Sequence, residues 1–368
     1  MQKRMCVIIS QATHQTRSYL TRNVSQKQSY FIPNQQQLPT SSNSVSMRKD
    51  NILKSDIGRN VYIMQKRSLC TRVRHRVVKP GTVGPERLVP RHIPRPSYVS
   101  ETWTPGQSGI IIKNERQIAG IWEACQVALN VLNLASRQLT VGMTTDDIDK
   151  LVHETCIAYG AYPSTLRYKG FPKSVCTSVN NVVCHGIPDN CPLVDGDIIN
   201  IDVTVYYKGF HGDVNKTYPI GSVDEEGLHL VRMAEHACVT GIQACGPGVK
   251  FAEIGKAIEP EMKEAGLTVI PLFCGHGIGE DFHEPPDIYH IANEESVEMK
   301  EGMVFTVGKF RHTEKRMLIE GEPIISEGGS NVEFLEDGWT VVTSDESRTA
   351  AWEHTVVITR DGVEVLTL

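Results

Sequence analysis

The chain has 368 residues, of which 40% are hydrophobic and 22% are charged, as in ordinary soluble globular proteins. No run of about 18 apolar residues occurs, so we expect no membrane-spanning helix. The net charge of −5 hides an asymmetry, because residues 1–79 hold 15 Lys and Arg against only two acids. This segment therefore carries a charge of +13, and the remainder carries −18.

Residues 1–79 are rich in Ser, Thr, Gln and Asn and lack hydrophobic periodicity. This composition, ahead of a folded domain, predicts a disordered targeting segment and a mitochondrial location. The alternative is a basic tail that binds nucleic acid, and no apolar stretch typical of a secretory signal is present. Because M-Q-K-R occurs at 1–4 and again at 64–67, Met64 is a second candidate start.

Residues 80–109 contain six prolines, which predicts an extended strap lying on the domain surface. The ten cysteines form no C-x-x-C pair and show no zinc-finger spacing. We therefore expect them to be reduced and mostly packed.

From residue 110 onwards the pattern is that of a folded domain. Apolar spacing of three and four predicts a helix over 115–136. A cap at 144–147 predicts a second helix that ends near Tyr159. The β-branched and aromatic segment 198–207 predicts a strand that turns at Lys208-Gly209 and returns along 210–218.

The second half repeats this plan at an offset of 106 residues. Gly142 and Gly160 match Gly248 and Gly266, D-G-D-I at 195–198 matches E-G-M-V at 301–304, and the helix predicted at 225–245 matches that at 115–136. Two similar α+β halves favour a site at the interface between them.

The repeat exposes an anomaly at residues 308–321. The position equivalent to Asp202 is a glycine, Gly308, and Glu322 falls there only if this basic 14-residue segment is removed. The segment is interpreted as an alternative splice form or a retained intron. The alternative is a tolerated surface loop, because loop insertions cost little entropy.

Four carboxylates and one imidazole occur in short, distinctive sequence motifs. Asp202 and Asp213 flank the hairpin turn, so we expect them to face each other about 5 Å apart, close enough to need a shared metal or proton. His276 is predicted in a glycine-rich loop, and Glu353 in a strand. With no thiolate among them, such ligands suit two divalent metals and hydrolysis. The five are Asp202, Asp213, His276, Glu322 and Glu353.

Residues 110–368 resemble the pita-bread metalloaminopeptidases, and most closely the type I methionine aminopeptidases. The motifs that carry the resemblance are G-F-P-K-S-V-C-T-S-V-N-N-V-V-C-H-G-I-P (170–188), N-I-D-V-T-V (200–205), F-H-G-D (210–213), C-G-H-G-I-G (274–279), F-H-E-P-P (282–286), E-P-I-I-S-E-G (322–328) and W-E-H-T-V (352–356). The resemblance implies an α+β pita-bread fold, in which two pseudo-symmetric halves surround a curved antiparallel sheet with helices outside.

The same resemblance implies removal of the N-terminal methionine from new polypeptides whose second residue is small. Two divalent ions (Co, Mn, Fe or Zn) would activate a water, one held by Asp202, Asp213 and Glu353 and the other by Asp213, His276, Glu322 and Glu353. Glu322 would accept a proton. His185 and His283 would contact the scissile amide, and a methionine pocket would be lined by Tyr168, Phe171, Cys176, Phe282 and Trp339.

The resemblance also bears on subtype and partners. The chain has neither an N-terminal Cys/His zinc cluster nor a long insert between the last two glutamates, which favours an organellar type I enzyme. We expect a monomer that works near the ribosome without binding a specific nucleic acid. The alternatives are a prolidase-like X-Pro peptidase and a binding protein or isoform whose catalysis the 308–321 segment impairs.

Overall fold

The computed structural model describes residues 75–99, 109–307, 311–312, 318–319 and 323–368. All of them belong to one contact unit, Arg67–Leu368. The predicted targeting segment lies outside the described residues except for its last five residues, and Glu322 lies outside them as well.

The predicted helices are confirmed, two of them at the expected boundaries. Asn114 and Thr144 each form a capping box, which satisfies the free N–H groups of the first turn. The helices are α2 (Glu115–Ser136), α3 (Thr145–Tyr159), α4 (Glu225–Gln243) and α5 (Ala252–Glu264), with short 3-10 turns η1 (Ser97–Val99) and η2 (Tyr168–Gly170).

The predicted hairpin strands are also confirmed, as β4 (Ile198–Tyr207) and β5 (Phe210–Pro219). They belong to an antiparallel sheet for which nine strands are seen among the described residues. Its central path runs β1-β4-β5-β16-β9-β7-β8, with β2 beside β4 and β17 beside β16. The other strands of this sheet are β1 (Tyr162–Pro163), β2 (Cys176–Val179), β7 (Cys274–Gly277), β8 (Glu284–Tyr289), β9 (Val304–Val307), β16 (Trp352–Thr359) and β17 (Gly362–Val365).

Three smaller ladders flank the main sheet. One pairs β6 (Thr268–Val269), β12 (Ile325–Ser326) and β15 (Thr349–Ala350), and a second pairs β3 (Val182–Cys184), β13 (Val332–Phe334) and β14 (Val341–Thr343). The third joins β10 (Arg311–His312) to β11 (Leu318–Ile319) within the 308–321 segment.

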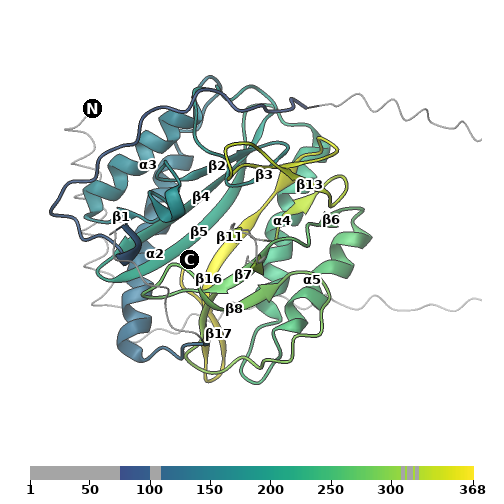
Figure 1. The fold of residues 1–368 in the computed structure, drawn as a ribbon. Coiled ribbons are helices and arrows are strands. Elements are labelled where there is room, and N and C mark those ends of the chain that lie inside the picture. Colours follow the sequence, from purple (N-terminus) through teal and green to yellow (C-terminus); the bar gives the residue numbers. More distant parts are fainter. Residues whose placement is uncertain (1–74, 100–108, 308–310, 313–317, 320–322) are drawn as a thin grey trace, which may run out of the picture. The chain divides into compact units, whose positions relative to one another are not determined.

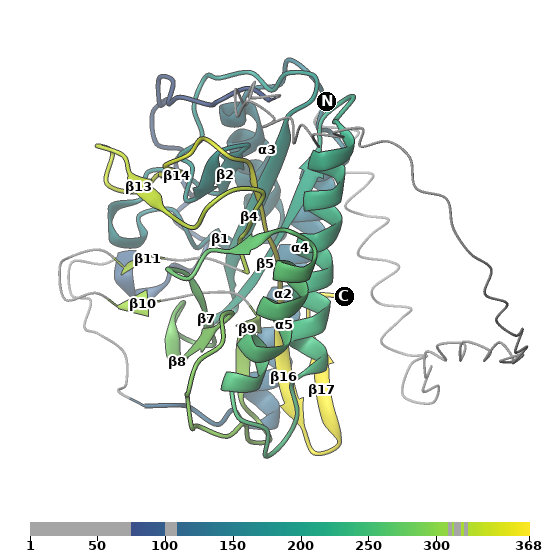
Figure 2. The same cartoon turned by 90° about the vertical axis from the view of Figure 1, so that its right-hand side faces the viewer.

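The helices cover one face of the main sheet (Figures 1 and 2). The sheet and α2 approach closely at Gly212 of β5, where an added Cβ would lie 2.3 Å from the backbone nitrogen of Cys125. A glycine is therefore required in the F-H-G-D motif, and the neighbouring Asp213 points to the opposite face. By length and composition α2 alone among the described helices could cross a membrane, but its buried residues pack into apolar clusters shared with the main sheet.

The two halves repeat in structure as they do in sequence. The backbone N–H of Gly142 bonds the Leu193 carbonyl at 2.8 Å, and that of Gly248 bonds the Met299 carbonyl at 2.8 Å, so both partners are shifted by 106. Each half has its own apolar core, one mainly under α2 and α3 and the other mainly under α4 and α5. The predicted pseudo-symmetric architecture is therefore confirmed.

Strand register shows the place of the 308–321 segment within this repeat. In the first half Pro163 pairs with Val205 of β4, and in the second half Val269 pairs with Ile325 of β12. Val269 follows Pro163 by 106 residues, whereas Ile325 follows Val205 by 120. The second half therefore holds 14 extra residues, and they lie between β9 and β12. On the two sides of the segment, β9 belongs to the main sheet and β12 to the small one.

The strap is bound along its described length. Arg76 forms an ion pair with buried Asp197 at 2.7 Å, although we expected residues 75–79 to belong to the disordered segment. Arg87 bonds Asp146 at 2.7 Å and Asp149 at 2.8 Å, and Val89 and Ile93 are buried against Tyr162 and Leu166. From residue 80 to residue 96 the strap contains no helix or strand.

The described cysteines are free, and all but Cys191 are buried. Burial raises the pKa of the Cys125 thiol to about 12. These observations fit the predicted set of reduced, packed cysteines.

A buried histidine should make stability depend on pH. Burial lowers the pKa of His290 to about 3, whereas an unfolded histidine titrates near pH 6.5. Its stabilising effect is therefore complete above about pH 6.5 and is lost as the pH falls towards 3. Below pH 6, we expect the slope of the unfolding free energy against pH to be smaller in His290→Leu than in wild type, by about 1.4 kcal/mol per pH unit.

Urea unfolding at pH 7 and pH 5 measures this difference. His92→Leu, at an exposed position of the strap, is the control that should leave the pH dependence unchanged. Equal pH dependence in wild type and His290→Leu would contradict the prediction.

Candidate metal centre

Asp202, Asp213, His276 and Glu353, the predicted ligands that the structure describes, lie in two neighbouring rows that cross the main sheet on one face. In the first row Asp202 of β4 pairs with Asn215 of β5, which pairs with Glu353 of β16. The second row contains Asp213, which pairs with Thr204, and His276, whose backbone N–H bonds the Thr306 hydroxyl at 3.3 Å. Residues two apart on a strand share a face, so both rows project their side chains to the side away from the helices.

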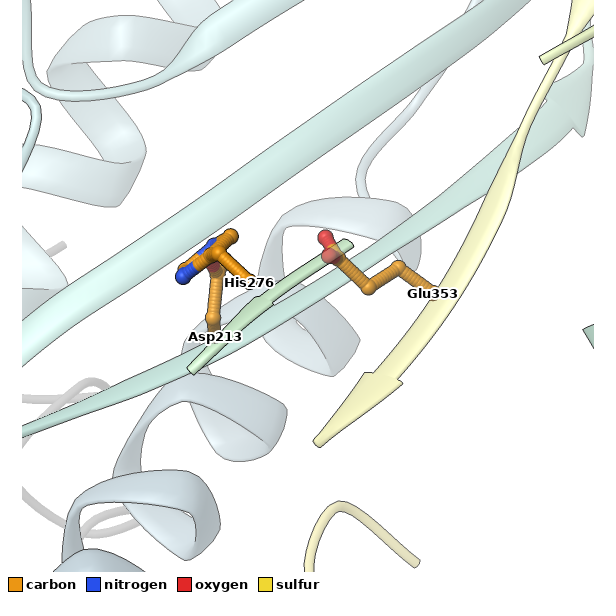
Figure 3. Close-up of side chains that lie close together, drawn as sticks. All are labelled: Asp213, His276 and Glu353. Carbon is orange, nitrogen blue, oxygen red and sulfur yellow. The ribbon is translucent and has the colours of Figure 1, made fainter. Parts of the chain in front are cut away.

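Three of these side chains converge. Ligating atoms of Asp213, His276 and Glu353 all lie within 4.8 Å of one another, and all three residues are buried. Figure 3 shows them approaching from three separate strands. The Nε2 atom of His276 is 3.6 Å from Oδ2 of Asp213. The buried carboxylates of Asp213 and Glu353 lie close enough to repel each other. A divalent cation held between these donors would relieve the repulsion.

Hydrogen bonds aim each of the three groups. The Nδ1–H of His276 donates to the Gly277 carbonyl at 2.8 Å, which leaves the Nε2 lone pair directed towards Asp213. The Thr204 hydroxyl donates to Oδ1 of Asp213 at 2.7 Å. The Asn215 amide donates to Oε2 of Glu353 at 2.8 Å. Such partners restrict ligand rotation and are typical of metal sites.

Two expectations about the ligands were wrong. Asp202 and Asp213 do not face each other, because the two-residue turn pairs Tyr207 with Phe210 and shifts the two acids to diagonal positions on one face. His276 lies in β7 rather than in a loop, because Gly277 pairs with Phe305 of β9. Glu353 lies in β16 as predicted.

The predicted substrate-binding residues form two groups. Phe171 and His185 pack edge-on against Trp339, with ring centroids 5.2 Å and 6.1 Å from it. Cys176 pairs with Asp202 across β2 and β4, which places its thiol on the face of the metal ligands.

The second group adjoins His276. His283 lies 4.2 Å from His276 between ring centroids. Tyr168 packs on Phe282 at 4.8 Å, and its hydroxyl is hydrogen-bonded to Nδ1 of His283 at 2.8 Å. Burial, with a smaller contribution from the charge of Asp281, raises the pKa of Tyr168, so the hydroxyl keeps its proton.

The residues that support the ligands were not predicted from the sequence. Thr204 and Asn215 are each two positions from a predicted acid, on the same face of the strand, and that spacing was the available signal. His211 was also missed, although it lies in F-H-G-D. It stacks on Phe282 at 5.3 Å and bonds Ser164 at 2.8 Å, and burial, followed by the nearby His276, lowers its pKa to about 3.

Comparison with known proteins agrees with this geometry. The profile described as Metallopeptidase family M24 matches residues 119–360. The chain belongs to metallopeptidase family M24. Its fold and its class, a metal-dependent peptidase, are therefore as predicted.

Within this family, the chain is similar to methionine aminopeptidases. The chain is 52% identical to methionine aminopeptidase 1D, mitochondrial, of Danio rerio, over 80% of this chain and 83% of the relative. The Homo sapiens protein of the same name is 49% identical over 80% of this chain and 84% of the relative. The crystal structure of methionine aminopeptidase from Rickettsia prowazekii superposes with a TM-score of 0.66 and 37% identity, over 71% of this chain and all of that one. The resemblance to type I methionine aminopeptidases is confirmed.

Proposed function

We propose that this chain removes the N-terminal methionine from newly made polypeptides in the mitochondrion, with a preference for a small second residue. The observation that carries the proposal is the convergence of Asp213, His276 and Glu353, with the rings of His283 and Phe282 packed beside His276. Sequence identities of 52% and 49% to two mitochondrial methionine aminopeptidases support the proposed substrate and the proposed location.

The residues fit two divalent cations that share ligands. Asp202, Asp213 and Glu353 would hold one, and Asp213, His276, Glu322 and Glu353 would hold the other. Oxygen and imidazole donors suit Mn, Fe, Co or Zn. When bound, such ions acidify a water for attack on the first peptide carbonyl.

The remaining side chains would bind and orient the substrate. His185 and His283 would hydrogen-bond the scissile amide and stabilise the developing oxyanion. The methionine side chain would lie among Tyr168, Phe171, Cys176, Phe282 and Trp339, where burial of its thioether favours binding. Glu322, for which the register offset predicts equivalence to Asp202, would accept a proton.

Peptide cleavage by the full-length protein tests this function. The protein, loaded separately with Mn, Fe, Co and Zn, should release methionine from Met-Ala-Ser and leave Ala-Pro-Ser intact. A variant lacking 308–321 is assayed beside it, so that an effect of this segment is not mistaken for a wrong substrate. Cleavage of Ala-Pro-Ser in place of Met-Ala-Ser would favour the X-Pro peptidase, and no cleavage together with no bound metal in both proteins would favour the binding protein.

Oligomeric state and ribosome association belong to the same proposal. We expect a monomer by analytical ultracentrifugation, and co-sedimentation with mitochondrial ribosomes that carry nascent chains. A stable dimer, or no association with ribosomes at low salt, would contradict these two expectations.

A further inference from the structure

The loop around Tyr168 is held in a conformation that the chain does not adopt by itself. Arg167 and Lys169, on either side of Tyr168, have φ values of 65° and 49°. Left-handed conformations are uncommon for residues with a Cβ, because the Cβ crowds the backbone there. Such a loop keeps its shape only where surrounding contacts enforce it.

The strap supplies these contacts on both sides of Tyr168. Glu86 accepts two hydrogen bonds from the Arg167 guanidinium, at 2.9 Å and 2.6 Å. Tyr98 of η1 packs edge-on against the Tyr168 ring, with centroids 4.9 Å apart, and its hydroxyl donates to the Ser164 carbonyl. The strap is itself anchored between these points by Arg87, which bonds two aspartates of α3.

The loop connects the strap to the candidate site. The Tyr168 hydroxyl is bonded to Nδ1 of His283, and the two rings are stacked at 5.1 Å. That bond restricts rotation of the His283 imidazole, whose ring lies 4.2 Å from the His276 ring between centroids. A shift of the Tyr168 ring would therefore misplace His283, and small misplacements of a catalytic group can cost up to a hundredfold in rate.

The geometry points to the strap as a positioning element of the active site, in which Tyr98 acts on His283 through Tyr168. This inference rests on the proposed function for its kinetic consequences, but the position of His283 can be measured without catalysis. Tyr98 touches neither His283 nor the predicted ligands in any contact seen among the described residues, so it is a positioning residue rather than a catalytic one.

The kinetic test is a double-mutant cycle in the metal-loaded full-length protein. We expect Tyr98→Leu to lower kcat/KM for Met-Ala-Ser roughly tenfold, mainly through kcat, with metal content unchanged. Tyr98→Phe keeps the ring and should retain most of the activity. Adding Tyr98→Leu to Tyr168→Phe should cause little further loss, because both changes break the same connection. Leu88→Ala, at a strap side chain that is 82% exposed, is the matched control.

The second measurement is the ¹⁵N spectrum of the histidine side chains in metal-free protein. The His283 signals, assigned by their absence in His283→Asn, should shift in Tyr98→Leu and stay in place in Leu88→Ala. The inference is overturned if the His283 signals are unchanged in Tyr98→Leu, or if the losses in kcat/KM multiply in the double variant. If the His283 signals shift in Tyr98→Leu but the wild-type protein releases no methionine, the proposed function is rejected and the positioning role is retained.

Discussion

Replacement of Asp213 by asparagine is expected to lower methionine release roughly a thousandfold, because losing a shared ligand forfeits several kcal/mol of metal-dependent stabilisation. Asp213 is the acid whose Oδ2 faces His276 and whose Oδ1 is held by Thr204. An asparagine amide retains the size of the side chain but supplies no charge. The measurement is kcat/KM for Met-Ala-Ser, together with metal content.

Thermal unfolding distinguishes metal loss from misfolding. Metal should raise the Tm of the wild-type protein by mass action, and this rise should be absent in Asp213→Asn. The metal-free variant should unfold no earlier than metal-free wild type, because one of two repelling buried carboxylates is gone. Asp361→Asn, in the exposed turn between β16 and β17, is the control for a lost acid. Full activity in Asp213→Asn would exclude this residue as a ligand.

Deletion of residues 308–321 is expected to raise methionine release at least about tenfold and to bring metal content towards two equivalents per chain. The strand registers on the two sides of this segment differ by 14 residues, and Glu322 follows it directly. Without the segment, Glu322 would occupy the place equivalent to Asp202. Metal content and kcat/KM of the deletion variant and the wild type test this.

A length-matched control separates the length of the segment from its sequence. Replacing 308–321 by fourteen Gly and Ser residues keeps the spacing, so this variant should behave as the wild type does. If the wild-type protein already binds two metals and matches the deletion variant, the segment is a tolerated loop. Sequencing the transcript across codons 300–330 shows whether the segment is expressed.

Local sequence patterns predicted the long elements well. The apolar period of α2 and the β-branched run of β4 yielded the observed boundaries, because both elements bury one or both faces along their whole length. The short strand β7 could not be predicted in this way. Its residues, C-G-H-G, have little strand propensity, and pairing with β8 and β9 makes them a strand.

The turn at Lys208-Gly209 lies where the sequence predicts it, and its register excludes the expected pairing of Asp202 with Asp213. Lys208 and Gly209 both have positive φ, which makes a two-residue turn and opposes Asp202 to Asn215. The chemistry of the acids was visible in the sequence, whereas their diagonal placement depended on this turn. The supporting threonine and asparagine residues were visible only as neighbours on the same strand face.

The sequence by itself determined the ligand types, the 106-residue repeat and the displacement of Glu322, because these depend on residue identity and spacing along the chain. Only the tertiary structure placed β16 between β5 and β9, which brings Glu353 beside Asn215 and Asp213. It alone showed the strap holding Tyr168 against His283. Such contacts join segments 70 to 140 residues apart, and their energies come from burial and packing between surfaces that no local pattern specifies.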